Sequence, residues 1–173
     1  EHYNLPAPFF VLATQNPVEQ AGTYPLPEAQ LDRFLMFVHV DYPSESEEIE
    51  ILKRTTGNQK ADLSAQLTAD DLIALQSIVR QVDISDALLH YVTALTRQTR
   101  PQDSSISIVE QYVRWGAGPR CVQALVLCAK AHAILENRYA VTIADIHAVA
   151  DPVLRHRLLL NFKADAQQVT VDK

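Results

Sequence analysis

The chain is short of basic side chains, and this shortage excludes one class of function. Its 173 residues include 15 Lys and Arg against 21 Asp and Glu, which gives a formal net charge of -6. A general nucleic-acid binder draws its affinity from many Lys and Arg contacts to phosphates. We therefore expect no nucleic-acid partner.

Cysteine is also scarce, and the two cysteines are not spaced for a disulfide or a metal. Cys121 and Cys128 fall on one predicted helix, where the helical rise separates them by about 10 Å. Disulfide partners lie within roughly 7 Å between Cα atoms, and a zinc site needs clustered His or further Cys ligands. We interpret both as small core residues in a reducing cytoplasm, and we expect no metal to be bound by this chain.

Long apolar runs and glycine-rich loops are absent. No stretch approaches the ~20 apolar residues of a membrane span, and the beginning, EHYNLPAP, has neither an initiating Met nor the basic-then-apolar order of a signal peptide. The four glycines form no phosphate-binding GxxxxGK[S/T] loop, and no apolar strand ends in an acidic pair that would hold Mg²⁺. We expect a cut or processed piece of a cytoplasmic protein.

With 47% hydrophobic and 21% charged residues, the composition is globular, and the first part of the chain has an α/β pattern. Residues 8–14 (PFFVLAT) and 35–43 (LMFVHVDYP) predict two buried strands, and PEAQLDRF between them predicts one or two helical turns. Ser44 with Glu47 predicts a capping box for a helix that ends at Gly57. This order is typical of an α/β layer, although two strands alone make a marginal sheet.

Beyond residue 60 the apolar period becomes helical. Predicted helix starts are Thr68, Ser85, Pro119, Thr142 (a capping box with Asp145) and Pro152, the last running through His156, with a further short helix around 109–114. We predict an α/β remnant followed by an all-helical bundle, helix-dominated overall. The expected boundaries are 1–57 for the α/β part, 58–68 for a linker, 69–160 for the bundle and 161–173 for a tail.

Two candidate phosphate contacts lie in the first part. Asn16 follows a predicted strand, where α/β sheets place ligand residues, and its carboxamide could hold a water against a phosphate oxygen. Alternatively, Asn16 simply begins an Asn-Pro turn. Arg33 has a guanidinium that matches phosphoryl oxygens, or it forms an ordinary surface ion pair with Asp32 or Glu28.

A third candidate, Arg120, begins the long predicted helix. Gly118 is the expected cap and Pro119 the first helical residue, so Arg120 lies in the first turn. A cation there opposes the helix dipole by roughly 0.3–1 kcal/mol, whereas a bound anion would suit the free N–H groups. The alternative is an Arg whose stem packs while its head reaches solvent. We interpret His156, between two arginines in LRHRLLL, as part of a cation cluster near the last carbonyls of a helix.

Taken together, ATQNP, GTYPLPEAQLDRF and GAGPR resemble the MoxR family of AAA+ ATPases, and they occur in that family's order. YPSESEE, the TR of RQTRP, ENRYAVTIADI and VLRHRLLL extend the similarity from about residue 7 to residue 165. The chain departs from the family at GAGPR, where relatives commonly have Ser before Pro, and at ENRY, which replaces a Gly-Arg pair. Gly and Ser both cap helices, so the first departure leaves Arg120 in place.

The resemblance implies a role for each candidate. Asn16 matches sensor 1, which orients the attacking water, and Arg33 matches the arginine finger that is offered to the neighbouring subunit. Arg120, with Gly118 and Pro119 before it, matches sensor 2 on the helical lid over the subunit's own ATP. An arginine finger supplied in trans can be worth about 10³–10⁵ in rate.

The resemblance also implies a function for the full-length protein. It would be an ATPase that uses ATP and Mg²⁺, assembles as a homo-oligomeric ring, a hexamer, and acts as a chaperone or in metal-cofactor insertion. A von Willebrand factor A-domain protein is an expected partner. This chain alone lacks the P-loop and is expected not to hydrolyse ATP. The alternatives are a magnesium-chelatase-like or helicase-like AAA+ subunit and a non-catalytic helical protein-binding module.

Overall fold

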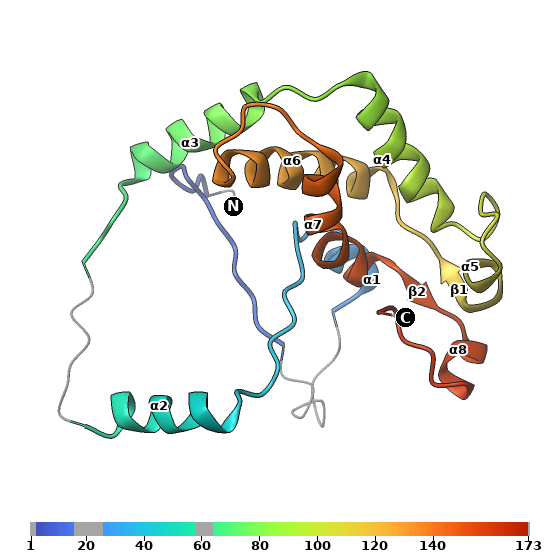
Figure 1. Ribbon diagram of the computed structural model, residues 1–173, viewed down its shortest axis with the longest axis horizontal. Helices are drawn as coiled ribbons and strands as arrows, with labels where there is room; N and C mark the ends of the chain where they lie inside the picture. The colour runs from blue at the N-terminus through green and yellow to red at the C-terminus, as the bar shows by residue number, and fades with distance from the viewer. Residues whose placement is uncertain (1–2, 16–25, 58–63, 173) are drawn as a thin grey trace.

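Helices dominate the computed structural model, which describes residues 3–15, 26–57 and 64–172 (Figure 1). The fold class predicted from the sequence, helix-dominated overall, is confirmed. The elements are α1 (Glu28–Leu31), α2 (Glu45–Thr55), α3 (Ala69–Gln81), α4 (Asp86–Gln98), α5 (Ser107–Tyr112), β1 (Val113–Trp115), α6 (Pro119–Leu135), α7 (Ile143–Leu154), the 3₁₀ turn η2 (Arg155–Arg157), β2 (Leu159–Leu160) and α8 (Phe162–Ala166).

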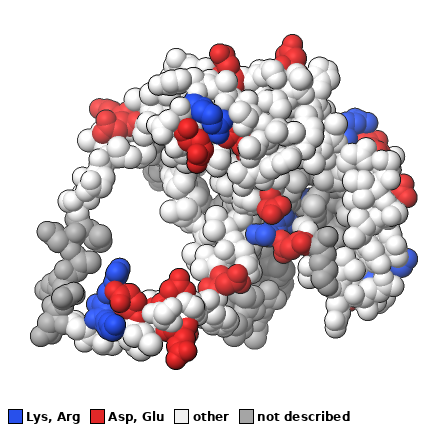
Figure 2. Space-filling view, viewed as in Figure 1, with Lys and Arg blue, Asp and Glu red and all other residues white. Residues whose placement is uncertain are grey.

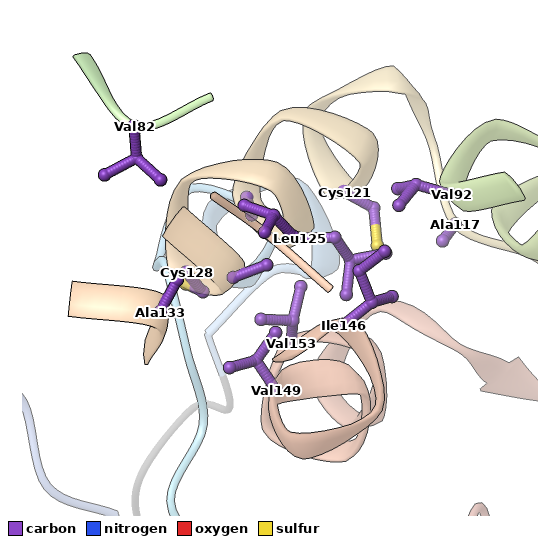
Figure 3. Close-up of a cluster of buried hydrophobic side chains, with 13 residues drawn as sticks. Val82, Val92, Ala117, Cys121, Leu125, Cys128, Ala133, Ile146, Val149 and Val153 are labelled. Atoms are coloured by element: carbon purple, nitrogen blue, oxygen red, sulfur yellow. The ribbon is translucent and has the colours of Figure 1, made fainter. Parts of the chain in front are cut away.

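The hydrophobic core forms around α6, which packs against α7 and also contacts α3 and α4. Its largest apolar members are Val92 from α4, Leu125 from α6, and Ile146 and Val153 from α7, all fully buried (Figure 3). Burying a side chain of this kind contributes about 1.5–3 kcal/mol. These four residues therefore contribute to the stability of the bundle.

Both cysteines lie in this core, as the sequence predicted. Cys121 and Cys128 are buried and unpaired on α6. Burial raises the pKa of each thiol to about 11, because the low-dielectric interior disfavours the thiolate. Both are therefore neutral thiols at pH 7 that pack as small apolar side chains.

Helix α6 ends in a Schellman motif at the ENRY sequence. Asn137 has a positive φ of 55°, the N–H of Asn137 donates to the carbonyl of Ile134 (2.9 Å), and the N–H of Arg138 donates to the carbonyl of Ala133 (2.8 Å). Asn tolerates the left-handed conformation better than most residues with a side chain. Asn137 thus stands where a glycine would otherwise be favoured, which explains how ENRY replaces a Gly-Arg pair.

The loop from α6 into α7 is fixed by the buried carboxylate of Asp145. The predicted capping box is present, with the Thr142 N–H and hydroxyl donating to Oδ2 at 2.7 and 2.8 Å. Arg138 donates to both carboxylate oxygens, and His132 Nδ1 lies 2.7 Å from Oδ1. The hydrogen bonds from Arg138, aided by those of His132 and Thr142, hold the pKa of Asp145 well below its usual range. This network joins the end of α6 to the beginning of α7.

The chain after α5 forms a small sheet that the sequence analysis did not predict. The helix expected around residues 109–114 is α5, which ends at Tyr112. β1 follows and pairs antiparallel with β2, Val113 lying opposite Leu160. Each strand has at most three residues, so no apolar alternation long enough to indicate a strand exists in the sequence.

The prediction that Pro152 starts a last helix was wrong. Pro152 lies inside α7, which continues to Leu154 before it tightens into η2. The carbonyl oxygen of Pro152 accepts the N–H of Phe37 at 2.8 Å. A contact with a distant part of the chain therefore supports the end of α7, and such a contact leaves no local sequence signal.

The two segments predicted as strands, residues 8–14 and 35–43, are extended but are assigned to no strand or ladder within the described ranges. A β-strand needs a neighbour to take its backbone hydrogen bonds. Their apolar side chains are exposed, as with Phe10 (75%), Leu12 (85%) and Val40 (83%). Side chains on both faces thus remain uncovered, and the two predicted strands do not form within the described ranges.

Acidic and basic side chains are mixed on the face shown in Figure 2, where Lys and Arg occur in small groups rather than in one continuous basic area. Helix α2, set apart from the bundle in Figure 1, carries both signs, including an ion pair between Arg54 and Glu50. None of the helices in the described ranges has the length and apolar character needed to cross a membrane.

Candidate functional site

The turn after α1 presents Arg33 to solvent. Pro27 precedes the helix, and the N–H groups of Asp32, Arg33 and Phe34 donate to the carbonyls of Glu28, Gln30 and Leu31. These short-range bonds fold the chain into a tight turn. Arg33 is exposed, whereas the flanking residues Asp32 and Phe34 are partly buried.

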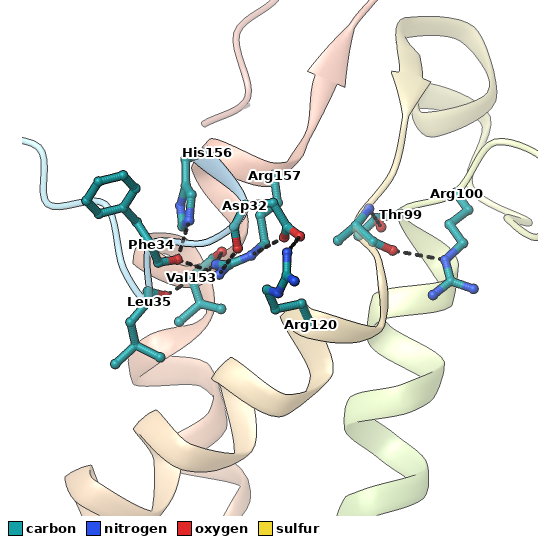
Figure 4. Close-up of polar contacts among 10 residues, drawn as sticks. Asp32, Phe34, Leu35, Thr99, Arg100, Arg120, Val153, His156 and Arg157 are labelled. Atoms are coloured by element: carbon teal, nitrogen blue, oxygen red, sulfur yellow. Dashed lines mark hydrogen bonds and ion pairs between the residues drawn. The ribbon is translucent and has the colours of Figure 1, made fainter. Parts of the chain in front are cut away.

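The beginning of α6 is fixed by close contact with the end of α4. Gly116 passes so near Thr99 that an added β-carbon would lie 2.3 Å from the Thr99 carbonyl oxygen. The N–H of Ala117 donates to Thr99 Oγ1, and Arg100 Nε donates to the carbonyl of Ala117, both at 3.0 Å (Figure 4). The TR of RQTRP therefore sets the position at which α6 begins.

Arg120 lies in the first turn of α6, as predicted. Gly118 is the N-cap and Pro119 is the first helical residue. The Nη1 of Arg120 is 2.9 Å from Oδ2 of Asp32, and the Arg120 side chain remains 53% exposed. One carboxylate thus connects the sensor 2 candidate to the turn that carries the finger candidate, across 88 residues of sequence.

Arg157, in η2, holds the same turn from a buried position. Its side chain is only 2% exposed. Nε donates to Oδ1 of Asp32 at 3.0 Å, Nη2 donates to the carbonyls of Asp32 (3.2 Å) and Phe34 (2.6 Å), and Nη1 donates to the carbonyl of Leu35 (3.3 Å) (Figure 4). Nη1 also donates to the carbonyl of Val153 in α7. All three nitrogens of the guanidinium are therefore engaged.

His156 adds a second contact between η2 and the turn. Its Nε2 is 3.1 Å from the carbonyl oxygen of Phe34, and its ring stacks on Phe37 with centroids 6.3 Å apart. Burial lowers the pKa of His156, and the neighbouring charge of Arg157 lowers it further. Because the carbonyl of Phe34 can only accept, this contact requires a proton on Nε2.

The arginines of η2 make contacts beyond those predicted from the sequence. The contact from Arg157 to the carbonyl of Val153 is the helix-end contact that we expected. Arg155 instead pairs with Asp172 at 2.6 Å, and the main partners of Arg157 and His156 belong to residues 32–37. The signal that could have indicated a buried role is the place of Arg157 directly before the apolar run of Leu158–Leu160, because an arginine in such a setting needs fixed acceptors.

The structure thus brings two of the three predicted positions together. Asp32, which directly precedes Arg33, pairs with Arg120 and Arg157, so the turn that carries Arg33 lies next to the beginning of α6. Within the described ranges Arg33 has no ion-pair partner, so the expected alternative of a surface pair with Asp32 or Glu28 does not form. Asn16 lies outside the described residues.

The described ranges contain no group of three or more His, Cys, Asp or Glu side chains that could hold a metal ion. A cavity of about 280 Å³ lies at the beginning of α6, lined by Arg100, Gln102, Arg114, Trp115, Gly116, Ala117, Gly118 and Pro119. It is slightly smaller than the usual 300–1,000 Å³ of a ligand pocket, and Arg120 does not line it. We assign no small-molecule site to it.

Comparisons with known proteins found similar sequences for both parts of the chain. Residues 1–36 match the model "ATPase family associated with various cellular activities (AAA)", and residues 105–173 match the model "AAA lid domain". Chaperone MoxR1 of Mycobacterium tuberculosis is 39% identical over 97% of this chain and 45% of its own length. YeaC of Bacillus subtilis, an uncharacterized protein, is 38% identical over 97% of this chain and 50% of its own.

A solved structure resembles the whole chain. It is a crystal structure of a candidate ATPase from Cytophaga hutchinsonii, with a TM-score of 0.91 at 38% identity over 98% of this chain and 52% of that one. The core and lid matches define an AAA-type ATPase class. Within that class, the chain belongs to the MoxR family of AAA+ ATPases. It spans about half the length of the curated relatives that it matches.

Proposed function

We propose that this chain is the C-terminal part of a MoxR-type AAA+ ATPase. Residues 1–57 would complete the α/β core, 58–68 would link, and 69–160 would form the lid. The complete protein would hydrolyse ATP with Mg²⁺ in a cytoplasmic ring of six subunits and act on partner proteins as a chaperone or in metal-cofactor insertion. The observation that carries the proposal is the contact at Asp32, which joins the turn bearing Arg33 to the beginning of α6.

Arg120 is suited to contact the phosphates of the subunit's own nucleotide. Its guanidinium is half-exposed, and an exposed ion pair such as that with Asp32 contributes only about 0–1 kcal/mol. Phosphate oxygens carry more charge than a carboxylate and accept the guanidinium fork bidentately. They can therefore replace Asp32 as the partner of Arg120 at the N-terminus of α6, where the helix dipole favours an anion.

Arg33 is suited to act on a nucleotide held by a neighbouring subunit. Its side chain is exposed and has no ion-pair partner in the described part of the chain, so no ion pair with a described residue must be broken. MgATP supplies the phosphoryl group, and a guanidinium placed against it stabilises the charge of the transition state. Asn16 would orient the attacking water, an assignment that depends on the ATQNP motif alone.

The uncovered apolar segments support the same conclusion. Phe9, Phe10 and Leu12 in one segment and Val38 and Val40 in the other are all more than half exposed. Apolar side chains on both faces of an extended segment are typical of central strands in a parallel α/β sheet. The remainder of an ATPase core, of the size that the curated relatives have, would supply the neighbouring strands.

The test is an ATPase assay on the complete gene product with Arg33→Ala subunits mixed into wild-type rings. Because the finger acts across an interface, activity should fall more steeply than the mutant fraction. Arg54→Ala, on α2 and paired with Glu50, is the matched control and should leave activity unchanged. Loss of activity only in proportion to the mutant fraction would contradict the role in trans.

Two further variants separate binding from turnover. Arg120→Ala should weaken ATP binding, whereas Asn16→Ala should slow turnover and spare binding, both measured with a fluorescent ATP analogue and steady-state kinetics. The 173-residue chain alone should show no hydrolysis above background. A von Willebrand factor A-domain protein is the partner class that we propose to add to the assay, with stimulation of turnover as the expected result.

A further inference from the structure

The turn that carries Arg33 is attached to the bundle by one buried guanidinium. Arg157 donates four hydrogen bonds to the turn, to Oδ1 of Asp32 and to the carbonyls of Asp32, Phe34 and Leu35. These acceptors lie immediately before and after Arg33 in the sequence. The backbone on both sides of Arg33 is thus fixed to η2, while the Arg33 side chain itself is exposed.

This attachment should persist when the bundle moves. A guanidinium that is 2% exposed cannot be left without acceptors, because breaking a buried pair is strongly destabilising. Two neighbouring contacts reinforce it, the N–H of Phe37 on the carbonyl of Pro152 and His156 Nε2 on the carbonyl of Phe34. The turn and the end of α7 therefore behave as one rigid piece.

The Asp32 carboxylate makes two contacts of unequal strength. Its Oδ1 is held by the buried Arg157, whereas its Oδ2 meets the half-exposed Arg120. When a phosphate replaces Asp32 as the partner of Arg120, only the contact between Arg120 and Oδ2 of Asp32 is lost. Asp32 stays with Arg157, so the turn remains attached to the bundle while Arg120 turns to the nucleotide.

We propose that Arg157 is a positioning residue for Arg33: it fixes the finger-bearing turn to the last helix of the lid, so that movement of the lid moves the arginine offered to the neighbouring subunit. This inference rests on the proposed function and assigns Arg157 no contact with nucleotide. It predicts that Arg157 contributes to turnover only through Arg33.

A double-mutant cycle in the complete ATPase tests it. Arg157→Gln removes the charge and most of the hydrogen-bond donors while keeping a polar side chain. The resulting misplacement of Arg33 should slow turnover, because a shift of about 1 Å at a reacting group can lower the rate 10²-fold. We expect kcat to fall about 10- to 100-fold with the KM for ATP changed less than about 2-fold. Arg33→Ala should lower kcat by at least the same factor. The double variant Arg33→Ala/Arg157→Gln should equal Arg33→Ala alone.

Two variants complete the design. Arg155 lies two residues from Arg157 in the same 3₁₀ turn and pairs with Asp172, and among the described residues no hydrogen bond or ion pair joins its side chain to residues 32–37. Arg155→Gln is therefore the matched control and should keep kcat within about 2-fold. Arg157→Lys retains the charge but has a single donor group. It should give an intermediate kcat and the same non-additivity, and it replaces Arg157→Gln in the cycle if that variant fails to fold.

The outcomes separate the inference from the function on which it rests. Suppose that Arg33→Ala slows turnover, and that adding Arg157→Gln to it lowers kcat further by the same factor as Arg157→Gln alone. Arg157 then acts independently of Arg33 and the inference is wrong. An unchanged kcat in Arg157→Gln, or an effect confined to KM, is equally contrary to it. If wild-type protein hydrolyses no ATP, or Arg33→Ala has no effect, the proposed function fails and the inference fails with it.

Discussion

Gly116 is the position at which one added methyl group should disturb the beginning of α6. A β-carbon there would lie 2.3 Å from the carbonyl oxygen of Thr99, 2.6 Å from its carbonyl carbon and 2.7 Å from the Cα of Arg100. All three are backbone atoms, so no flexible side chain can move aside. In Gly116→Ala the two backbones must separate by about 1 Å, which is overpacking of the kind that costs 1–3 kcal/mol.

The same separation would weaken two hydrogen bonds. The N–H of Ala117 donates to Thr99 Oγ1, and Arg100 Nε donates to the Ala117 carbonyl. A typical hydrogen bond contributes about 0.5–1.5 kcal/mol. Together with the overpacking, we expect Gly116→Ala to lower the free energy of unfolding by roughly 2–4 kcal/mol.

Gly118→Ala is the matched control, since a β-carbon at Gly118 meets no atom within 4 Å. It should lose only part of the N-cap preference, about 1 kcal/mol or less. Urea unfolding of the 173-residue chain, followed by circular dichroism and by the fluorescence of its single tryptophan, Trp115, measures both variants. A difference between them of less than about 0.5 kcal/mol would refute the close approach of Gly116 to Thr99.

Three other predictions concern the bundle. Asp145→Asn should lower the free energy of unfolding by about 3 kcal/mol at pH 7, because it breaks a buried charged network. The pKa of Asp145 is depressed in the folded state, so its contribution to the free energy of unfolding is complete above the unfolded pKa of about 3.9 and is lost as the pH falls below it. The difference in free energy of unfolding between wild type and Asp145→Asn, measured in urea, should therefore shrink from pH 6 to pH 3. A constant difference would contradict the network. Leu125→Ala should cost about 2–5 kcal/mol by thermal or urea unfolding, against little change for Leu135→Ala, whose side chain is 79% exposed. Burial raises the thiol pKa of Cys121 and Cys128 to about 11. Both should therefore react with iodoacetamide at pH 8 only after unfolding. Fast alkylation of the native chain would mean that α6 is not packed as described.

Helix beginnings were predictable from the sequence because their signals are local. The capping box of Ser44 with Glu47 and that of Thr142 with Asp145 both form, and Pro119 begins α6 as expected. In each case a side chain bonds a backbone group three residues away, or a ring fixes the φ of its own residue. All the interacting groups therefore lie within a few residues of one another in the sequence.

The contacts that assemble the candidate site were not predictable in this way. Asp32 and Arg157 are separated by 125 residues, and nothing near either residue indicates the other. Asp32 was considered only as a partner of Arg33, its neighbour in sequence, although the turn directs it to the bundle. The strands expected at 8–14 and 35–43 were not predictable for a similar reason. An apolar run indicates burial, but it does not supply the neighbouring strand that a β-strand requires.

The attachment of the 32–37 turn to α7 has a consequence for where the chain can be cut. By sequence order the bundle begins after residue 63, but Phe37 and Asp32 complete the end of its last long helix. A shortened chain that starts at residue 64 would leave Arg157 facing a gap, with its Val153 contact and no partner from the turn. Separate expression of the lid should therefore succeed only when residues 28–37 are supplied, for example as a synthetic peptide added in trans.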